Sequence, residues 1–174
     1  VPVIGDVGTG AFDFHCEPGH LIRRLHQIAT SIFLEQCREL GVTPVQFAAI
    51  SAIGRHAGLE QREIARLIAT DRTTINLVST KLEQRGWVRR IRTGRKVVLS
   101  LTAEGQGALQ SLKRLTHYHS SALLSPLAPS ERDRFVSLIT KLVQGNNAMS
   151  RVPVHHPADL ATSPTQIDST LLKQ

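Results

Sequence analysis

A cluster of basic side chains in the middle of the chain has the clearest chemical meaning. Six of the twelve residues from Arg85 to Lys96 are Lys or Arg, and none is acidic. The wider window 61–96 holds ten basic and three acidic residues, a surplus of +7, and the whole chain is also +7. All of the excess charge therefore lies in about a fifth of the sequence. A field concentrated in this way attracts a polyanion.

The segment that precedes the cluster predicts how a polyanion would be recognised. Asp71 is a good N-cap for a helix, and Gly86 stands where a helix commonly ends. The apolar residues of one face are Ile75, Val78 and Leu82. The opposite face is polar and short-chained, with no carboxylate among its residues Thr73, Asn76, Leu77, Thr80 and Gln84. Such a face suits the major groove of DNA, where base edges must be met closely.

A β-hairpin is expected to carry the basic cluster. Residues 87–92 and 96–101 alternate in the manner of strands, with a tight turn at 93–95. Its arginines would lie along the DNA backbone or enter the minor groove. The predicted DNA-binding residues are Gln61, Arg72, Thr73, Thr74, Asn76, Leu77, Thr80, Lys81, Gln84, Arg90, Arg92, Arg95 and Lys96. The alternative is a solvated face beside a basic hairpin that aids solubility.

The elements that must position these residues are mostly helices. Apolar residues recur at spacings of three and four, with capping residues and glycines between the periodic segments. The expected helices run from 18 to about 41, from Pro44 to Gly58, over 61–69, from Asp71 to Gly86, from Thr102 to about 124, and from Ser130 onward. The predicted fold class is mainly α with one β-hairpin, a winged helix-turn-helix flanked by long helices at both ends.

Length and composition are those of one domain with appendages. The chain has 174 residues, of which 41% are apolar and only 4% aromatic, so aliphatic residues must build the core. Its longest apolar runs are far shorter than the roughly 20 residues that a membrane span requires. Cys16 and Cys37 do not make a disulfide framework, and no secretory leader is evident. We expect a cytoplasmic protein.

Five segments in register resemble the MarR family of bacterial transcriptional regulators, over roughly residues 17–150. These segments are 40–49, 61–68, 71–75, 78–90 and 99–105. One departure concerns the wing, where the family usually carries an Asp-x-Arg-x-x-Arg stretch whose Asp orients an arginine. Here that stretch is shortened to 92–96, Arg-Thr-Gly-Arg-Lys. The depth to which this wing enters the minor groove is therefore left open.

The resemblance implies an obligate homodimer, usually a repressor, whose terminal helices interlock. Two recognition helices would read a pseudo-palindromic double-stranded DNA site, and a ligand pocket would lie between the dimer helices and the DNA-binding lobe. The expected domains are a flexible arm (1–16), an N-terminal dimerisation helix (17–43), a DNA-binding lobe (44–101), C-terminal dimerisation helices (102–150) and a tail (151–174).

Family members commonly release DNA when a small aromatic acid binds. An arginine can bind a carboxylate bidentately, and an aromatic side chain can form one wall of the pocket. The predicted ligand-binding residues are His20, Arg23, Arg24, Phe47 and Ser51. For the two arginines, ion pairing at the dimer interface is an equal alternative. The stretch 18–24 also resembles regulators of aromatic and heteroaromatic acid catabolism, which suggests a hydroxybenzoate or hydroxynicotinate.

Other functions find less support in the sequence. A redox-sensing repressor could use Cys16, but a reactive thiol needs electropositive surroundings that lower its pKa. A winged-helix module that binds protein is disfavoured by the local charge surplus. None of the eight histidines has zinc-motif spacing, and no catalytic motif is found. We therefore expect no enzyme activity, no catalytic residue, no metal and no cofactor.

Overall fold

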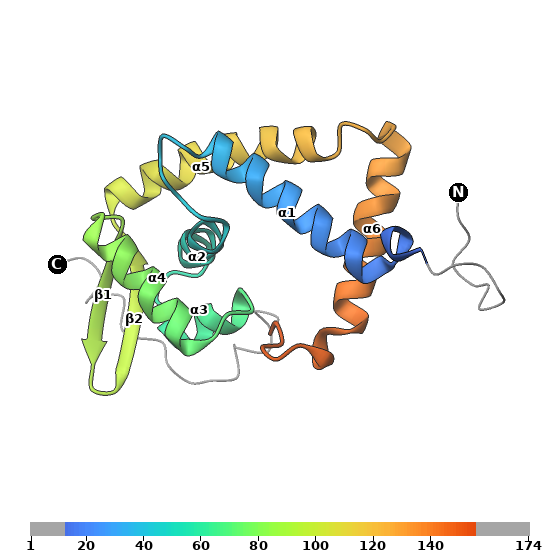
Figure 1. Ribbon diagram of the computed structural model, residues 1–174. Helices are drawn as coiled ribbons and strands as arrows, with labels where there is room; N and C mark the ends of the chain where they lie inside the picture. Colours follow the sequence, from blue (N-terminus) through green and yellow to red (C-terminus); the bar gives the residue numbers. More distant parts are fainter. Residues whose placement is uncertain (1–12, 156–174) are drawn as a thin grey trace.

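The helix α2 (Pro44–Arg55) lies at the centre of the molecule, where Figure 1 shows it end-on. The structure is a computed structural model and describes residues 13–155. Three side chains of α2, Ala49, Ile50 and Ile53, are at most 1% exposed. Helices α1, α3, α4 and α5 and strand β2 all pack against α2. One aliphatic core therefore joins the long helices to the helix-turn-helix.

The elements follow the predicted order. They are η1 (Phe14–Cys16), α1 (Pro18–Gln36), α2, α3 (Gln61–Leu67), α4 (Arg72–Gln84), β1 (Val88–Thr93), β2 (Lys96–Leu101), α5 (Ala103–Leu123), α6 (Pro129–Gly145) and η2 (Asn147–Met149). In the sequence, long helices precede and follow a helix-turn-helix and a two-stranded sheet, and in space α1 and α5 pack together on one side of them (Figure 1). The predicted fold class is confirmed.

Side-chain caps define the helix starts that the sequence predicted. The Thr43 hydroxyl accepts a hydrogen bond from the Gln46 N–H, and the Gln46 side chain accepts one from the Thr43 N–H. The Asp71 carboxylate accepts from the Thr74 N–H at the start of α4. These bonds satisfy donors that have no partner within the first helical turn.

Several helix boundaries differ from the prediction, and α2 and α3 end two or three residues early, at Arg55 and Leu67. The first helix ends at Gln36 rather than near Gly41, and the chain continues through turns in which Gly41 takes a positive φ of 55°. The last helix begins at Pro129, with Ala128 and not Ser130 at the N-cap. Proline suits the first helical position because its fixed φ is already helical and its missing N–H needs no partner. The Glu131 carboxylate accepts from the Ala128 N–H, as a capping side chain does.

The hairpin is bound to the helical core along one edge. Its strands pair from Val88↔Leu101 to Thr93↔Lys96, and Gly94 in the turn has a φ of 58°. An isolated bridge joins Glu60, at the start of α3, to Val98 of β2. Val98 and Leu99 are buried, so β2 contributes to the core while the hairpin tip extends away from it (Figure 1).

The long helices leave much of their apolar surface uncovered in the single chain. On α1, Leu21, Ile22 and Ile28 are exposed, and no residue of α6 is buried. The exposed apolar residues of α6 include Val136, Leu138, Leu142 and Val143. Within residues 13–155, none of the helices is both long and apolar enough to cross a bilayer.

A pair of glycines in α5 offers a test of the junction between the hairpin and the long helices. A Cβ at Gly105 would collide with the carbonyl oxygen of Trp87, whereas a Cβ at Gly107 meets open space. We expect Gly105→Ala to lower the free energy of unfolding by about 2 kcal/mol, since overpacking against backbone forces a shift. Gly107→Ala should raise it by about 0.5–1 kcal/mol, because alanine favours a helix. Urea unfolding of both variants checks this; equal effects would contradict it.

Candidate nucleic-acid interface and ligand cavity

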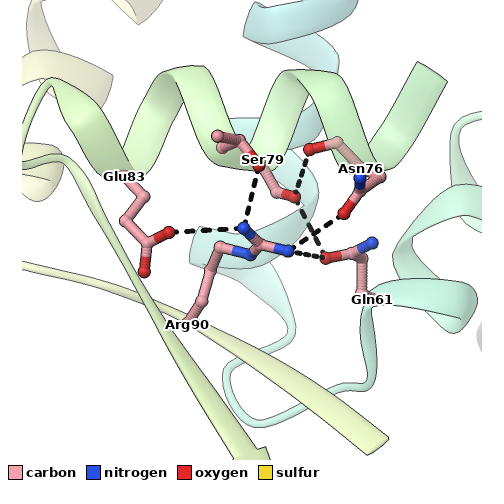
Figure 2. Close-up of polar contacts among 6 residues, drawn as sticks. Gln61, Asn76, Ser79, Glu83 and Arg90 are labelled. Atoms are coloured by element: carbon pink, nitrogen blue, oxygen red, sulfur yellow. Dashed lines mark hydrogen bonds and ion pairs between the residues drawn. The ribbon is translucent and has the colours of Figure 1, made fainter. Parts of the chain in front are cut away.

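The guanidinium of Arg90 joins the hairpin to the helix-turn-helix (Figure 2). Arg90 lies on β1, and its side chain is only 13% exposed. One terminal nitrogen, Nη1, donates to Thr80 Oγ1 at 2.8 Å and lies 3.3 Å from Glu83 Oε2. The other, Nη2, donates to Asn76 Oδ1 at 3.0 Å and to Gln61 Oε1 at 3.5 Å. One strand side chain therefore holds α3 and α4 in a fixed relation to the hairpin.

A buried serine completes this network. Ser79 is fully buried on α4, and its hydroxyl donates to Gln61 Oε1 at 3.0 Å (Figure 2). Arg90 Nη2 donates to the same oxygen atom. The amide oxygen of Gln61 is thus shared by two donors. Gln61, Asn76, Thr80 and Arg90 were predicted to contact DNA separately, and the structure brings them into one cluster.

The remaining basic residues of the hairpin divide into two kinds. Arg92 and Arg95 are exposed near the hairpin tip. Lys96 is half-buried, and its Nζ lies 2.9 Å from Glu60 Oε1. The other oxygen of Glu60 pairs with Arg62 Nε at 2.8 Å. Glu60, which the sequence analysis did not single out, thus supplies from α3 an acidic partner for a basic residue of the shortened wing.

The outer face of α4 is exposed as predicted. Ile75, Val78 and Leu82 are buried, and the exposed side chains of the other face are Arg72, Thr73, Asn76, Leu77, Lys81 and Gln84. Thr74 belongs to the cap instead, since its hydroxyl donates to Asp71 Oδ2 at 2.7 Å. The hydrogen bonds from the Thr74 backbone and hydroxyl lower the pKa of Asp71. Asp71 therefore stays ionised at the helix start, as a cap should.

A cavity of about 700 Å³ lies between α2 and α5 and is lined by Phe47 and Ser51, as the sequence suggested. Ser51 Oγ is buried and has no hydrogen-bond partner among the described residues. The polar groups around it are ones that sequence reasoning missed, because they come from three separate parts of the chain. The other lining residues are Ala52, Gly54, Arg55, His56, Leu67, Lys113, Val154 and His155. An apolar floor with several basic groups suits a small aromatic anion.

The other three predicted ligand residues lie elsewhere in the single chain. His20, Arg23 and Arg24 stand at the start of α1 and do not line this cavity. The His20 ring packs against Phe14, with centroids 4.1 Å apart, and its Nδ1 lies 3.4 Å from Arg23 Nη2. Partial desolvation and the nearby Arg23 lower the pKa of His20.

Neither cysteine has the surroundings of a reactive thiol. The Cys16 thiol donates to Asp13 Oδ2 at 3.2 Å, and this hydrogen bond to a carboxylate raises its pKa. Burial raises the pKa of Cys37 as well. Within residues 13–155, no three His, Cys, Asp or Glu side chains are grouped to hold a metal ion.

Known proteins are similar to this chain in sequence and in fold. A sequence model of the MarR family matches residues 42–94, from the start of α2 to the hairpin turn. The HTH-type transcriptional repressor NicR of Pseudomonas putida is 27% identical over 138 residues, which are 78% of this chain and 87% of NicR.

Solved structures of transcriptional regulators have a similar fold. The PcaV transcriptional regulator of Streptomyces coelicolor, in complex with its natural ligand, is 30% identical with a TM-score of 0.69, over 78% of this chain and 98% of PcaV. Bordetella bronchiseptica BpsR, whose DNA binding is regulated by 6-hydroxynicotinic acid, shares the fold at 24% identity. Its TM-score is 0.72, over 78% of this chain and 99% of BpsR.

The Arg90 cluster can be tested by a substitution that keeps the charge. Arg90→Lys removes the planar fork that reaches four acceptors at once, so we expect the free energy of unfolding to fall by about 2 kcal/mol. Arg92→Lys, the exposed counterpart on the same strand, should change it by less than about 0.5 kcal/mol. Urea denaturation measures both, and equal stability of the two variants would show that the cluster does not hold the hairpin.

Proposed function

Because the chain belongs to the MarR family of transcriptional regulators, we propose that it is a homodimeric repressor that binds a pseudo-palindromic operator and leaves it when a small aromatic acid binds. The observation that carries the DNA-binding part is the Arg90 cluster, which joins the polar face of α4 to the basic hairpin. NicR, a relative over most of both chains, is a transcriptional repressor.

Within this proposal, α4 enters the major groove and the hairpin follows the backbone. Asn76 Oδ1 accepts from Arg90, so the amide NH₂ remains for an acceptor on a base or phosphate. Exposed Leu77, 56% accessible, suits the methyl group of a thymine. Arg92 and Arg95 near the hairpin tip contact phosphates or the minor groove. Arg90, in contrast, positions these groups.

The proposed dimer follows from the uncovered apolar faces of α1 and α6. Residues 17–43 and 102–150 are assigned to dimerisation and residues 44–101 to the DNA-binding lobe. Leucines and valines left at half exposure on two long helices need a partner surface, and a second copy of the same helices supplies one. The dimer would hold two α4 helices about one DNA turn, roughly 34 Å, apart.

The proposed effector site is the cavity beside α2. Phe47 offers an aromatic wall, the unpartnered Ser51 Oγ a hydrogen bond, and Lys113 a positive charge for a carboxylate. BpsR shows that this fold accommodates regulation by 6-hydroxynicotinic acid, an aromatic acid of the proposed class. His20, Arg23 and Arg24 contribute only if a second copy carries them to the cavity.

Release from DNA is a shift between two spacings of the recognition helices. Only a difference in acid affinity between those spacings can move the equilibrium. α2 lines the cavity and packs against both α4 and α5. A ligand bound there therefore affects how the DNA-binding lobe is positioned relative to the long helices.

The DNA-binding part is tested with wing variants. Arg92→Ala and Arg95→Ala should each weaken binding to every sequence and flatten the log–log salt dependence by about 0.9, the contribution of one phosphate contact. Fluorescence anisotropy on promoter and scrambled duplexes at several salt concentrations measures this. Wild-type affinity and slope in both variants would remove the hairpin from the interface and favour a protein partner.

Base reading by α4 should behave differently. Asn76→Ala is expected to reduce discrimination at particular base pairs by about 1–3 kcal/mol, with a salt slope close to that of the unchanged chain. A panel of operators with single base-pair changes measures it. Uniform weakening across that panel would assign Asn76 a positioning role through Arg90 alone.

The effector part is tested at Lys113. Lys113→Gln should weaken binding of salicylate or 6-hydroxynicotinate about tenfold, the equivalent of one charge-assisted hydrogen bond. The neighbouring Arg114→Gln, which does not line the cavity, is the matched control. Isothermal titration calorimetry measures affinity, and anisotropy measures operator release. An acid that binds tightly but leaves operator affinity unchanged would end the proposal of ligand-controlled release.

A further inference from the structure

A short segment after η2 belongs to no helix or strand, yet hydrogen bonds hold its C-terminal end in place. This segment, Arg151–His155, is called the strap below. The Asn147 amide holds the backbone of Val154 from both sides: Nδ2 donates to the Val154 carbonyl, and Oδ1 accepts from the Val154 N–H, each at 2.9 Å. The His155 N–H donates to the Arg66 carbonyl at 3.2 Å.

These bonds carry the strap from the end of α6 to the end of α3. Arg66 lies in the last turn of α3, and its carbonyl also accepts from the Ala69 N–H at 3.5 Å. Figure 1 shows the chain running from η2, below α6, toward the region of α3. The His155 N–H therefore adds a second donor to a helix-end carbonyl, and backbone and side-chain bonds hold the strap in one place.

The place where the strap is held is the cavity beside α2. Val154 and His155 line that cavity together with Phe47, Ser51 and Lys113. Val154 adds apolar surface, and the His155 ring adds a group that can both stack on a flat ring and hydrogen-bond.

We infer that the strap is one wall of the effector site and that His155 contacts the bound aromatic acid. The inference rests on the proposed effector function and extends it to a segment far in sequence from the other lining residues. It assigns ligand affinity in part to Asn147, which touches the strap and does not line the cavity. Asn147 is thus a positioning residue for the site.

Two shortened chains distinguish the contribution of the strap to ligand binding from that of the residues that follow it. A chain ending at His155 keeps the strap, and a chain ending at Ser150 lacks it. By calorimetry with salicylate and 6-hydroxynicotinate, the chain ending at His155 should bind like the full chain, while the chain ending at Ser150 should bind about tenfold more weakly. Equal affinities of the two shortened chains would overturn the inference while leaving the effector function standing.

Point variants guard against a folding defect in the shortened chains. His155→Ala and Asn147→Ala should weaken acid binding in the same direction. The matched control is Asn146→Ala, whose amide donates only within α6, to the Leu142 carbonyl. If Asn147→Ala and Asn146→Ala bind the acid equally, Asn147 does not position the wall.

Chemical labelling in the absence of ligand distinguishes the strap inference from the proposed effector function. In a Cys16→Ser background, Ser51→Cys places a thiol in the cavity, and Cys37 stays buried. Maleimide labelling should be several-fold faster in the chain ending at Ser150 than in the chain ending at His155. Equal rates would show that the strap does not cover the cavity. Failure of the full chain to bind either acid would instead overturn the effector function, and the ligand contact of His155 with it.

Discussion

The charge of Arg90 is the constraint on which the arrangement of the hairpin and the helix-turn-helix depends. A guanidinium that is 13% exposed must be compensated, and a buried charge that loses its partners is strongly destabilising. Here the compensation comes from four side chains on two helices. The hydrogen bonds that compensate the buried charge therefore also fix the position of the hairpin. The hairpin cannot move relative to α4 without breaking several of these bonds together.

A second buried charge, of the opposite sign, joins the start of α3 to the start of β2. Glu60 is nearly buried at the start of α3, and Lys96 and Arg62 neutralise its two oxygens. The chain thus pairs a lysine of the wing with an acid that lies just before α3. A wing two residues long at its turn can therefore still be anchored, and Arg92 and Arg95 are left near its exposed tip.

Apolar surface is distributed unevenly between the two halves of the molecule. The helix-turn-helix and hairpin surround α2 and bury their aliphatic side chains within one chain. The long helices α1 and α6 keep large apolar residues exposed. The helix-turn-helix and hairpin thus share one core with α1 and α5, whereas the exposed faces of α1 and α6 are the surfaces that the proposed dimer would cover. The cavity proposed as the effector site lies beside α2, which packs against both α4 and α5, so a ligand there would favour one relation between the two halves over another.

The sequence alone determined the element order, several of the caps and the fold class, because hydrophobic period and capping are properties of neighbouring residues. Asp71 and Thr43 were identified as caps, and the burial of Ile75, Val78 and Leu82 follows from helical spacing. The charge surplus is also read from the sequence, but from it Arg90, Arg92 and Arg95 were all expected to contact DNA. Only the tertiary structure separates Arg90, enclosed by acceptors from α3 and α4, from the exposed Arg92 and Arg95. Local sequence patterns could not predict the lining of the cavity either, because Ser51, Lys113 and His155 meet only when α2, α5 and the strap pack together. Contacts between residues so far apart in the chain depend on packing across elements, which no period within one element encodes.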